Sequence, residues 1–279
     1  ELHKEEATLQ FAVPKAWLIF SLVLVGISIL VAIIGPLMAP YGYNETFVAE
    51  RLAPPAAQHL MGTDNVGRDI FSRVLYGIRV DVMSGLACAG IIVGLAMFWA
   101  ILETRARRAS STLGTTFENL LILPREILCA FPWLALLLIF VSLTAPGNEV
   151  LMLILITSLI LLPRGVAMIR EAYQSLPEGK NWLQNLIRTL PVMFIFSVAG
   201  GIIYISTLTY NGYGIPPPNP ELGGMLSGTG LRYMVQAPWM GQWPLYCLLL
   251  LLLIWVMAGE VLLERLGFRS KAIWSKSME

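Results

Sequence analysis

Long apolar stretches alternate with shorter polar segments along the chain, and six of the apolar stretches are long enough to cross a lipid bilayer. An α-helix rises about 1.5 Å per residue, so roughly 20 apolar residues cross a hydrocarbon core about 30 Å thick. The pattern therefore predicts an all-α membrane protein with six transmembrane helices. The predicted spans are residues 17–39, 82–102, 117–144, 149–169, 191–211 and 244–263.

Three of these spans have features that bear on the prediction. The first exceeds the apolar region of about 7–15 residues of a signal peptide, and no small-x-small cleavage site follows it, so it is predicted to be a true span. The third contains two prolines and the charged pair Arg125 and Glu126, so we expect a kink or a tilt there. The fourth is the weakest, because Pro163 and Arg164 interrupt it.

The distribution of Lys and Arg predicts the orientation. If the N-terminus lies in the cytoplasm, most of the 19 Lys and Arg residues fall in cytoplasmic segments, as the positive-inside rule requires. We therefore expect the terminal segments 1–16 and 264–279 and the polar segment 170–191 to face the cytoplasm. Residues 40–81 and 211–243 then form the two long outside loops, and the second of these is rich in Pro and Gly.

An amphipathic helix is predicted at the end of the first outside loop. Between residues 68 and 79, apolar side chains share one helical face and polar side chains share the other, which is typical of a helix lying at the membrane surface before the second span. The apolar face holds Ile70, Phe71, Val74, Leu75 and Ile78, and the polar face holds Arg68, Ser72, Arg73, Tyr76 and Arg79.

Composition narrows the function classes. Only 13% of the residues are charged against 56% hydrophobic, and the net charge of +1 gives no reason to expect nucleic acid as a partner. Cys88, Cys129 and Cys247 lie far apart in apolar stretches, so we read them as small buried hydrophobes rather than as a disulfide framework or a metal site. Gly179-Lys180 lacks the rest of a phosphate-binding loop, so no nucleotide site is predicted in this chain.

Gly85, Gly90 and Gly94 predict close helix packing in the second span.

The segment HLMGTDNVGRDIFSRVLYGIRV, residues 59–80, resembles a pattern of the permease subunits of bacterial ABC importers. In the dipeptide, oligopeptide and nickel branch, and within it the C-type partner of the permease pair, this pattern reads H-P-L-G-T-D-x-x-G-R-D-x-x-S-R-x-x-x-G-x-R. Leu60 replaces the proline. The matching residues are Gly62, Thr63, Asp64, Gly67, Arg68, Asp69, Ser72, Arg73, Gly77 and Arg79.

Two further regions resemble the same family. Glu118, Glu126 and Pro132 lie where it usually has Asp, Asp and Pro. Towards the C-terminus, one residue departs from the pattern, since Leu222 stands where a Trp is usual. The matches there are Pro220, Gly223, Ala237-Pro238-Trp239, Pro244 and Gly259-Glu260, with Glu260 in the place of Asp.

The polar segment 170–191 resembles the cytoplasmic signature of these permeases, which reads E-A-A, three residues, Gly and, further on, an apolar residue and Leu-Pro. Glu171-Ala172 and Leu190-Pro191 match it. Tyr173 replaces the second Ala, Pro177 occupies the glycine position, and the spacing to Leu-Pro is one residue longer. Because proline fixes φ and removes an N–H, we expect a coupling helix of altered geometry.

The resemblance implies that this segment docks on a partner ATPase. Residues 170–176 and 181–187 would form two helical arms joined by a turn at 177–179, with Glu171 facing basic groups of the ATPase and Leu176 and Trp182 in its groove. A polar loop without a coupling role is the alternative. The predicted coupling residues are Arg170, Glu171, Ala172, Leu176, Pro177, Gly179, Trp182 and Pro191.

The resemblance also implies the architecture and the partners. It predicts a type I ABC importer permease in the bacterial cytoplasmic membrane, with five of its helices in a core over residues 82–263. A second homologous permease subunit, two ATPase subunits and an external substrate-binding protein would complete the complex. This chain would bind no cofactor, and ATP and Mg would bind on the ATPases. Peptides or related small solutes would cross by alternating access.

Other function classes stay open. A secondary transporter or channel needs no ATPase, but the chain lacks a rich intramembrane relay of ionisable residues. A membrane enzyme is disfavoured because no constellation of His, Asp, Glu and Cys gathers on one side of the membrane. A degenerate permease with an assembly role is consistent with the departures at Pro177 and Leu222. Arg125 and Glu126 are adjacent and cannot share one helix face, so they need different partners. The family resemblance implies that Glu126 faces other helices, and we weigh structural pairing above a role in the substrate pathway.

Overall fold

The protein is all-helical in the parts that the computed structural model describes, which are residues 14–108, 149–174, 182–227 and 232–266 together with isolated positions between 116 and 139. Within these residues the backbone forms no strand beyond a single antiparallel bridge between Thr63 and Asp69. This confirms the predicted fold class. The elements are α2 (Lys15–Met38), η1 (Val48–Glu50), α3 (Ile70–Arg108), α6 (Glu149–Gln174), α7 (Trp182–Tyr210), α8 (Leu222–Leu226) and α10 (Trp239–Arg265).

Five of the described helices are long and apolar enough to cross a membrane. They are α2, α3, α6, α7 and α10, and each covers one of the predicted spans to within one residue. Pro163 lies inside α6 without ending it. The remaining prediction, the span at 117–144, falls mostly outside the described residues.

The amphipathic segment is helical, but it is not a separate helix on the membrane surface. It forms the first turns of α3, which continues without a break to Arg108 and is about 58 Å long at 1.5 Å per residue. No proline interrupts this sequence, so nothing ends the helix before the apolar part begins. Part of its polar face is also covered, because Ser72 and Arg73 are buried beneath the neighbouring loops.

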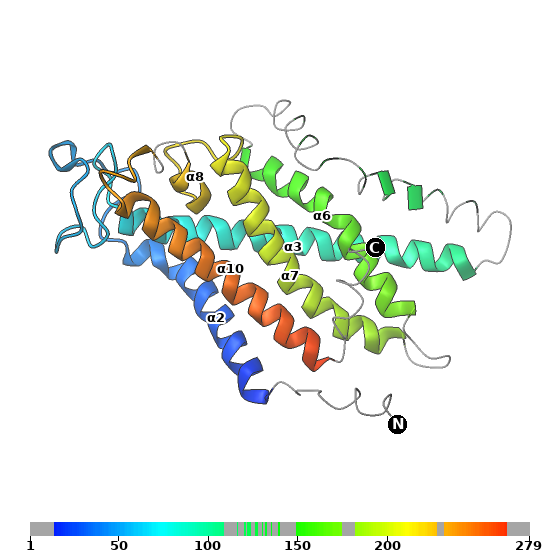
Figure 1. The fold of residues 1–279 in the computed structure, drawn as a ribbon. Coiled ribbons are helices and arrows are strands. Elements are labelled where there is room, and N and C mark those ends of the chain that lie inside the picture. The colour runs from blue at the N-terminus through cyan, green and yellow to red at the C-terminus, as the bar shows by residue number, and fades with distance from the viewer. Residues whose placement is uncertain are drawn as a thin grey trace, which may run out of the picture.

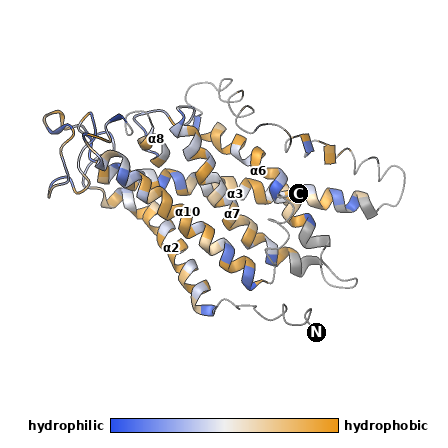
Figure 2. Ribbon diagram, viewed as in Figure 1, coloured by the Kyte–Doolittle hydropathy of each residue, from blue (hydrophilic) through white to orange (hydrophobic). Residues whose placement is uncertain are grey.

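Helix α3 forms the centre of the bundle. It packs against α2, α6 and α7, and α10 packs against α2, α7 and α8 (Figure 1). Figure 2 shows that apolar residues predominate along these helices, whereas the loops joining α2 to α3 carry more polar ones. Many apolar side chains of α2 and α10 are exposed, as expected of surfaces that meet lipid or another membrane subunit.

The bundle has two distinct ends. At one, which we name the loop end, lie residues 40–69, residues 211–227 and 232–238, and the short helix α8 (Figure 1). At the opposite end, which we name the coupling end, lie the start of α2 and the ends of α3, α6 and α10, together with the start of α7. The segments predicted to be cytoplasmic that the structure describes therefore share one end of the molecule.

Glycines set the closest helix contacts. A Cβ atom on Gly201 of α7 would lie 3.0 Å from the Cα atom of Gly85 of α3, so these two backbones cross in near contact. The prediction of close packing is therefore confirmed for Gly85. Among the described residues, a Cβ atom at Gly90 or Gly94 would have no neighbour within 4 Å, so these two glycines make no such contact there.

Candidate functional site

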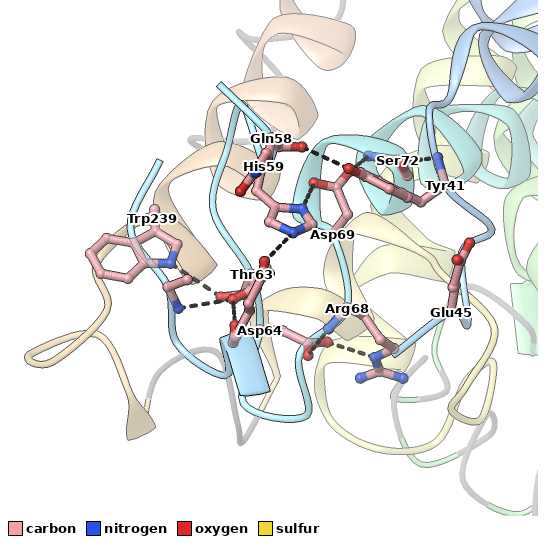
Figure 3. A network of polar contacts seen from close by, with 12 residues as sticks. Tyr41, Glu45, Gln58, His59, Thr63, Asp64, Arg68, Asp69, Ser72 and Trp239 are labelled. Carbon is pink, nitrogen blue, oxygen red and sulfur yellow. Dashed lines mark hydrogen bonds and ion pairs between the residues drawn. The ribbon is translucent and has the colours of Figure 1, made fainter. Parts of the chain in front are cut away.

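The residues of the 59–80 motif come together at the loop end in a compact polar cluster. Figure 3 shows side chains from the α2–α3 loop, the start of α3 and the start of α10 pointing toward one another. We name this group the motif cluster. Its members in contact include Tyr41, His59, Thr63, Asp64, Arg68, Asp69, Ser72, Arg73 and Trp239.

Two glycines of the motif allow the loop to fold this tightly. Gly62 and Gly67 have positive φ values of 76° and 87°, a region that side-chain-bearing residues rarely occupy. A Cβ atom on Gly67 would also collide with the carbonyl group of Phe47, and one on Gly62 would lie 2.6 Å from the indole ring of Trp239. Both positions therefore require glycine for conformation and for space.

Asp64 organises the turn that follows. Its Oδ1 atom accepts hydrogen bonds from the backbone N–H groups of Val66 and Arg68, each at 2.9 Å. Its Oδ2 atom lies 2.6 Å from Nε of Arg68 and 3.9 Å from Nε of Arg73. One carboxylate thus fixes the backbone of the turn and offsets two guanidinium charges.

Asp69 starts helix α3. Its Oδ2 atom accepts a 2.7 Å hydrogen bond from the backbone N–H of Ser72, three residues into the helix, which is the geometry of an N-cap. The hydroxyl of Ser72 accepts in turn from the backbone N–H of Tyr41 at 3.2 Å. The end of the α2 segment is thereby tied to the first turn of α3.

His59 joins two carboxylates. Its Nδ1 atom lies 2.9 Å from Oδ1 of Asp69, and its Nε2 atom lies 2.7 Å from Oε2 of Glu50. Both neighbours are carboxylate oxygens, so the ring links Glu50 in the loop to Asp69 at the start of α3. Sequence reasoning missed this pairing, because Glu50 lies nine residues from His59 in a loop with no periodic pattern.

Arg73 and Trp239 connect the cluster to the rest of the loop end. Arg73, which is 6% exposed, donates through Nη1 to the carbonyl groups of Tyr43 at 2.9 Å and Pro218 at 3.2 Å. Nε1 of Trp239, the first residue of α10, donates to the carbonyl of Thr63 at 3.2 Å. The motif cluster therefore holds the two long loops and the starts of α3 and α10 together.

Two motif residues lie beyond the cluster. Gly77 allows Leu222 of α8 to approach, since a Cβ atom on this glycine would lie 3.1 Å from Cδ2 of Leu222. Leu222 is completely buried in the position where the family pattern has a Trp. Arg79 is exposed on α3.

The predicted coupling residues lie at the coupling end or outside the described residues. Arg170 is half-buried in α6, whose last turns include Glu171 and Ala172, and Trp182 is the first residue of α7. Pro191 is exposed within α7. Leu176, Pro177 and Gly179 lie outside the described residues. The described parts of the two predicted arms, residues 170–174 and 182–187, are thus continuous with the spans on either side rather than separate helices.

The predicted intramembrane pair is described in part. Glu126 is helical and exposed, and Arg125 lies outside the described residues. In the described part of the chain, no three His, Cys, Asp or Glu side chains come together in a way that would hold a metal ion.

Comparisons with known proteins identify the family. Residues 17–55 match the family model of the N-terminal transmembrane domain of oligopeptide transport permease C. The dipeptide transport system permease protein DppC of Escherichia coli K12 is 30% identical over 279 residues, which cover 91% of this chain and 89% of that protein. The chain belongs to the family of ABC peptide-transport permeases.

Other relatives agree with this assignment. DppC of Haemophilus influenzae is 29% identical over 91% of this permease and 90% of its own length. A Brucella suis protein with a provisional assignment as a peptide transport system permease is 31% identical over 80% of this chain and 78% of its own. The permease is accordingly the membrane-spanning component of an ABC importer, and the motif cluster is a structural element within it.

Proposed function

We propose that this permease moves peptides or related small solutes across the bacterial cytoplasmic membrane, driven by ATP hydrolysis on partner subunits. A second homologous permease, two ATPases and an external binding protein would complete the importer. The named activity of the relatives supports the substrate class, because they are peptide or dipeptide transport permeases.

The single observation that carries the coupling part of the proposal is that α6 and α7 extend beyond their membrane spans, to Gln174 and from Trp182 respectively. Helix α6 runs on to Gln174 and α7 begins at Trp182, so both predicted arms are extensions of membrane spans. A force applied between residues 174 and 182 would act directly on two rigid helices. An ATPase that binds this segment is therefore in a position to move both spans together.

Close packing between helices supports transmission of that movement. A Cβ atom on Gly165 of α6 would lie 3.1 Å from Ile92 of α3, and one on Gly200 of α7 would lie 3.0 Å from Leu161 of α6. Helices that pack this tightly shift as a group, because a dense core deforms little. A displacement at the coupling end would thus reach α3 and, through it, the loop end.

Affinity purification from the native membrane, followed by a mass-spectrometric inventory, tests the proposal. We expect one second permease and two ATPase chains for each copy of this chain. Glu171→Lys should lower the recovery of the ATPases, whereas Glu264→Lys, an exposed carboxylate at the end of α10, should leave it unchanged. Recovery of the chain without ATPases, together with solute transport in vesicles that lack ATP, would instead identify a secondary transporter.

A further inference from the structure

Two buried acidic side chains meet at the loop end, away from the motif cluster. Asp81 lies on α3 and Glu221 immediately precedes α8, and each is 1% exposed. Ser206 of α7, 3% exposed, completes the group. Three membrane-associated elements therefore contribute one polar side chain each to a single enclosed site.

Glu221 accepts a full set of hydrogen bonds. Its Oε1 atom accepts from the hydroxyl of Ser206 at 2.7 Å and from the backbone N–H of Gly223 at 3.0 Å. Its Oε2 atom accepts from the backbone N–H of Gly224 at 2.6 Å. Three donors are thus directed at the carboxylate of Glu221, one from α7 and two from the first turn of α8.

Asp81 has a different environment. Its Oδ2 atom accepts one long hydrogen bond of 3.4 Å from the backbone N–H of Leu222, and its Oδ1 atom is buried without a partner. Its side chain lies within hydrogen-bonding reach of Glu221, which is the one ionisable neighbour recorded for it among the described residues. Neither nearby arginine of α3 contacts it: Arg73 contacts Asp64 and two loop carbonyls, and Arg79 is exposed.

We propose that Asp81 and Glu221 form a proton-binding site, in which a proton on Asp81 is donated to the carboxylate of Glu221. Two ionised carboxylates in contact repel each other, and burial without a cation makes that repulsion costly. A single proton removes the repulsion and turns the unpartnered oxygen of Asp81 into a donor. Among the described residues, no cationic side chain lies beside the pair to offset its charge.

The site fastens α8 to the bundle. Helix α8 packs against α3, α7 and α10, and the Asp81–Glu221 contact joins its start to α3 while Ser206 joins it to α7. Any movement that separates α3 from α8 must break the shared proton bond. The site therefore stabilises the arrangement of α3, α7 and α8 at the loop end.

Substitutions at Asp81 test the site in the full chain, purified with its partner subunits. Asp81→Asn keeps the shape and supplies a permanent N–H donor, so we expect the apparent melting temperature of the wild type. Asp81→Ala removes the donor and leaves a cavity, so we expect a lower melting temperature. Glu264→Gln, a change at an exposed carboxylate of α10, serves as the matched control.

Infrared spectroscopy detects a protonated carboxyl group directly. A purely structural role of Asp81 would not produce this absorption. The wild type at neutral pH should show absorption from a protonated carboxyl group that disappears in Asp81→Asn and persists in Glu264→Gln. The proposal is overturned if the wild type lacks this band. It is also overturned if the stability of the wild type depends on added sodium compared with choline at constant pH, which would mark a metal-cation site instead.

Discussion

At the scale of single residues, the motif that relates this chain to its family serves mainly to build the loop end. Asp64, Asp69 and the two positive-φ glycines fix backbone turns, and Arg73 ties two distant loops together. The contacts described for these side chains all lie within the loop end. Their substitution should therefore affect folding before it affects the choice of solute.

Gly67 gives the sharpest test of this structural role. Gly67→Ala should lower the free energy of unfolding by more than about 1 kcal/mol, since a positive φ and a collision with Phe47 act together. Gly212→Ala is the matched control, because its φ of 84° is equally unfavourable but no atom lies within 4 Å of the added Cβ. Thermal unfolding in detergent should rank Gly67→Ala below Gly212→Ala, and equal losses would refute the proposed contact with Phe47.

Asp64 tests the charge balance of the motif cluster. Asp64→Asn should cost about 3 kcal/mol, because it leaves the buried guanidinium of Arg73 without its carboxylate and breaks the pair with Arg68. Glu45→Gln removes an exposed carboxylate that bonds one backbone N–H, so it should cost at most about 1 kcal/mol. Unfolding by denaturant measures both, and a similar cost for the two changes would contradict the account.

At the scale of elements, the lengths of the apolar stretches predicted five of the described membrane spans with useful accuracy. Length and composition alone define an apolar helix, so local sequence was sufficient for them. The start of α3 was misread because its polar face is covered by residues far away in the chain, such as Pro218, which contacts Arg73. The Asp81–Glu221 contact was missed for the same reason, since 140 positions separate the two residues and no local pattern connects them.

The crossing of α3 and α7 depends on the absence of side chains. Gly201→Ala should lower the free energy of unfolding by about 1–3 kcal/mol, because the new methyl group would push against the backbone of Gly85. Gly90→Ala, on the same helix as Gly85 but facing open space, should leave stability unchanged or slightly raised. Equal melting temperatures for the two variants would show that α3 and α7 can move apart at this crossing without a loss of stability.

At the scale of the whole molecule, the structure divides the chain between two ends, and the Lys and Arg distribution predicts which end faces the cytoplasm. Ala57 is exposed at the loop end and Arg105 is exposed near the end of α3. In a variant whose three cysteines are replaced, Ala57→Cys should react with a membrane-impermeant thiol reagent in intact cells. Arg105→Cys should react only after permeabilisation, and the reverse pattern would invert the predicted topology.

The central claim is that the segment between α6 and α7 couples this permease to its ATPases. The most direct measurement is ATP-driven uptake by the reconstituted complex in which residues 175–181 are replaced by a Gly/Ser linker of equal length. If the segment couples the two subunits, uptake should fall to the level seen without ATP, because a flexible linker cannot transmit force to the two helices. Uptake equal to that of the wild type would contradict it.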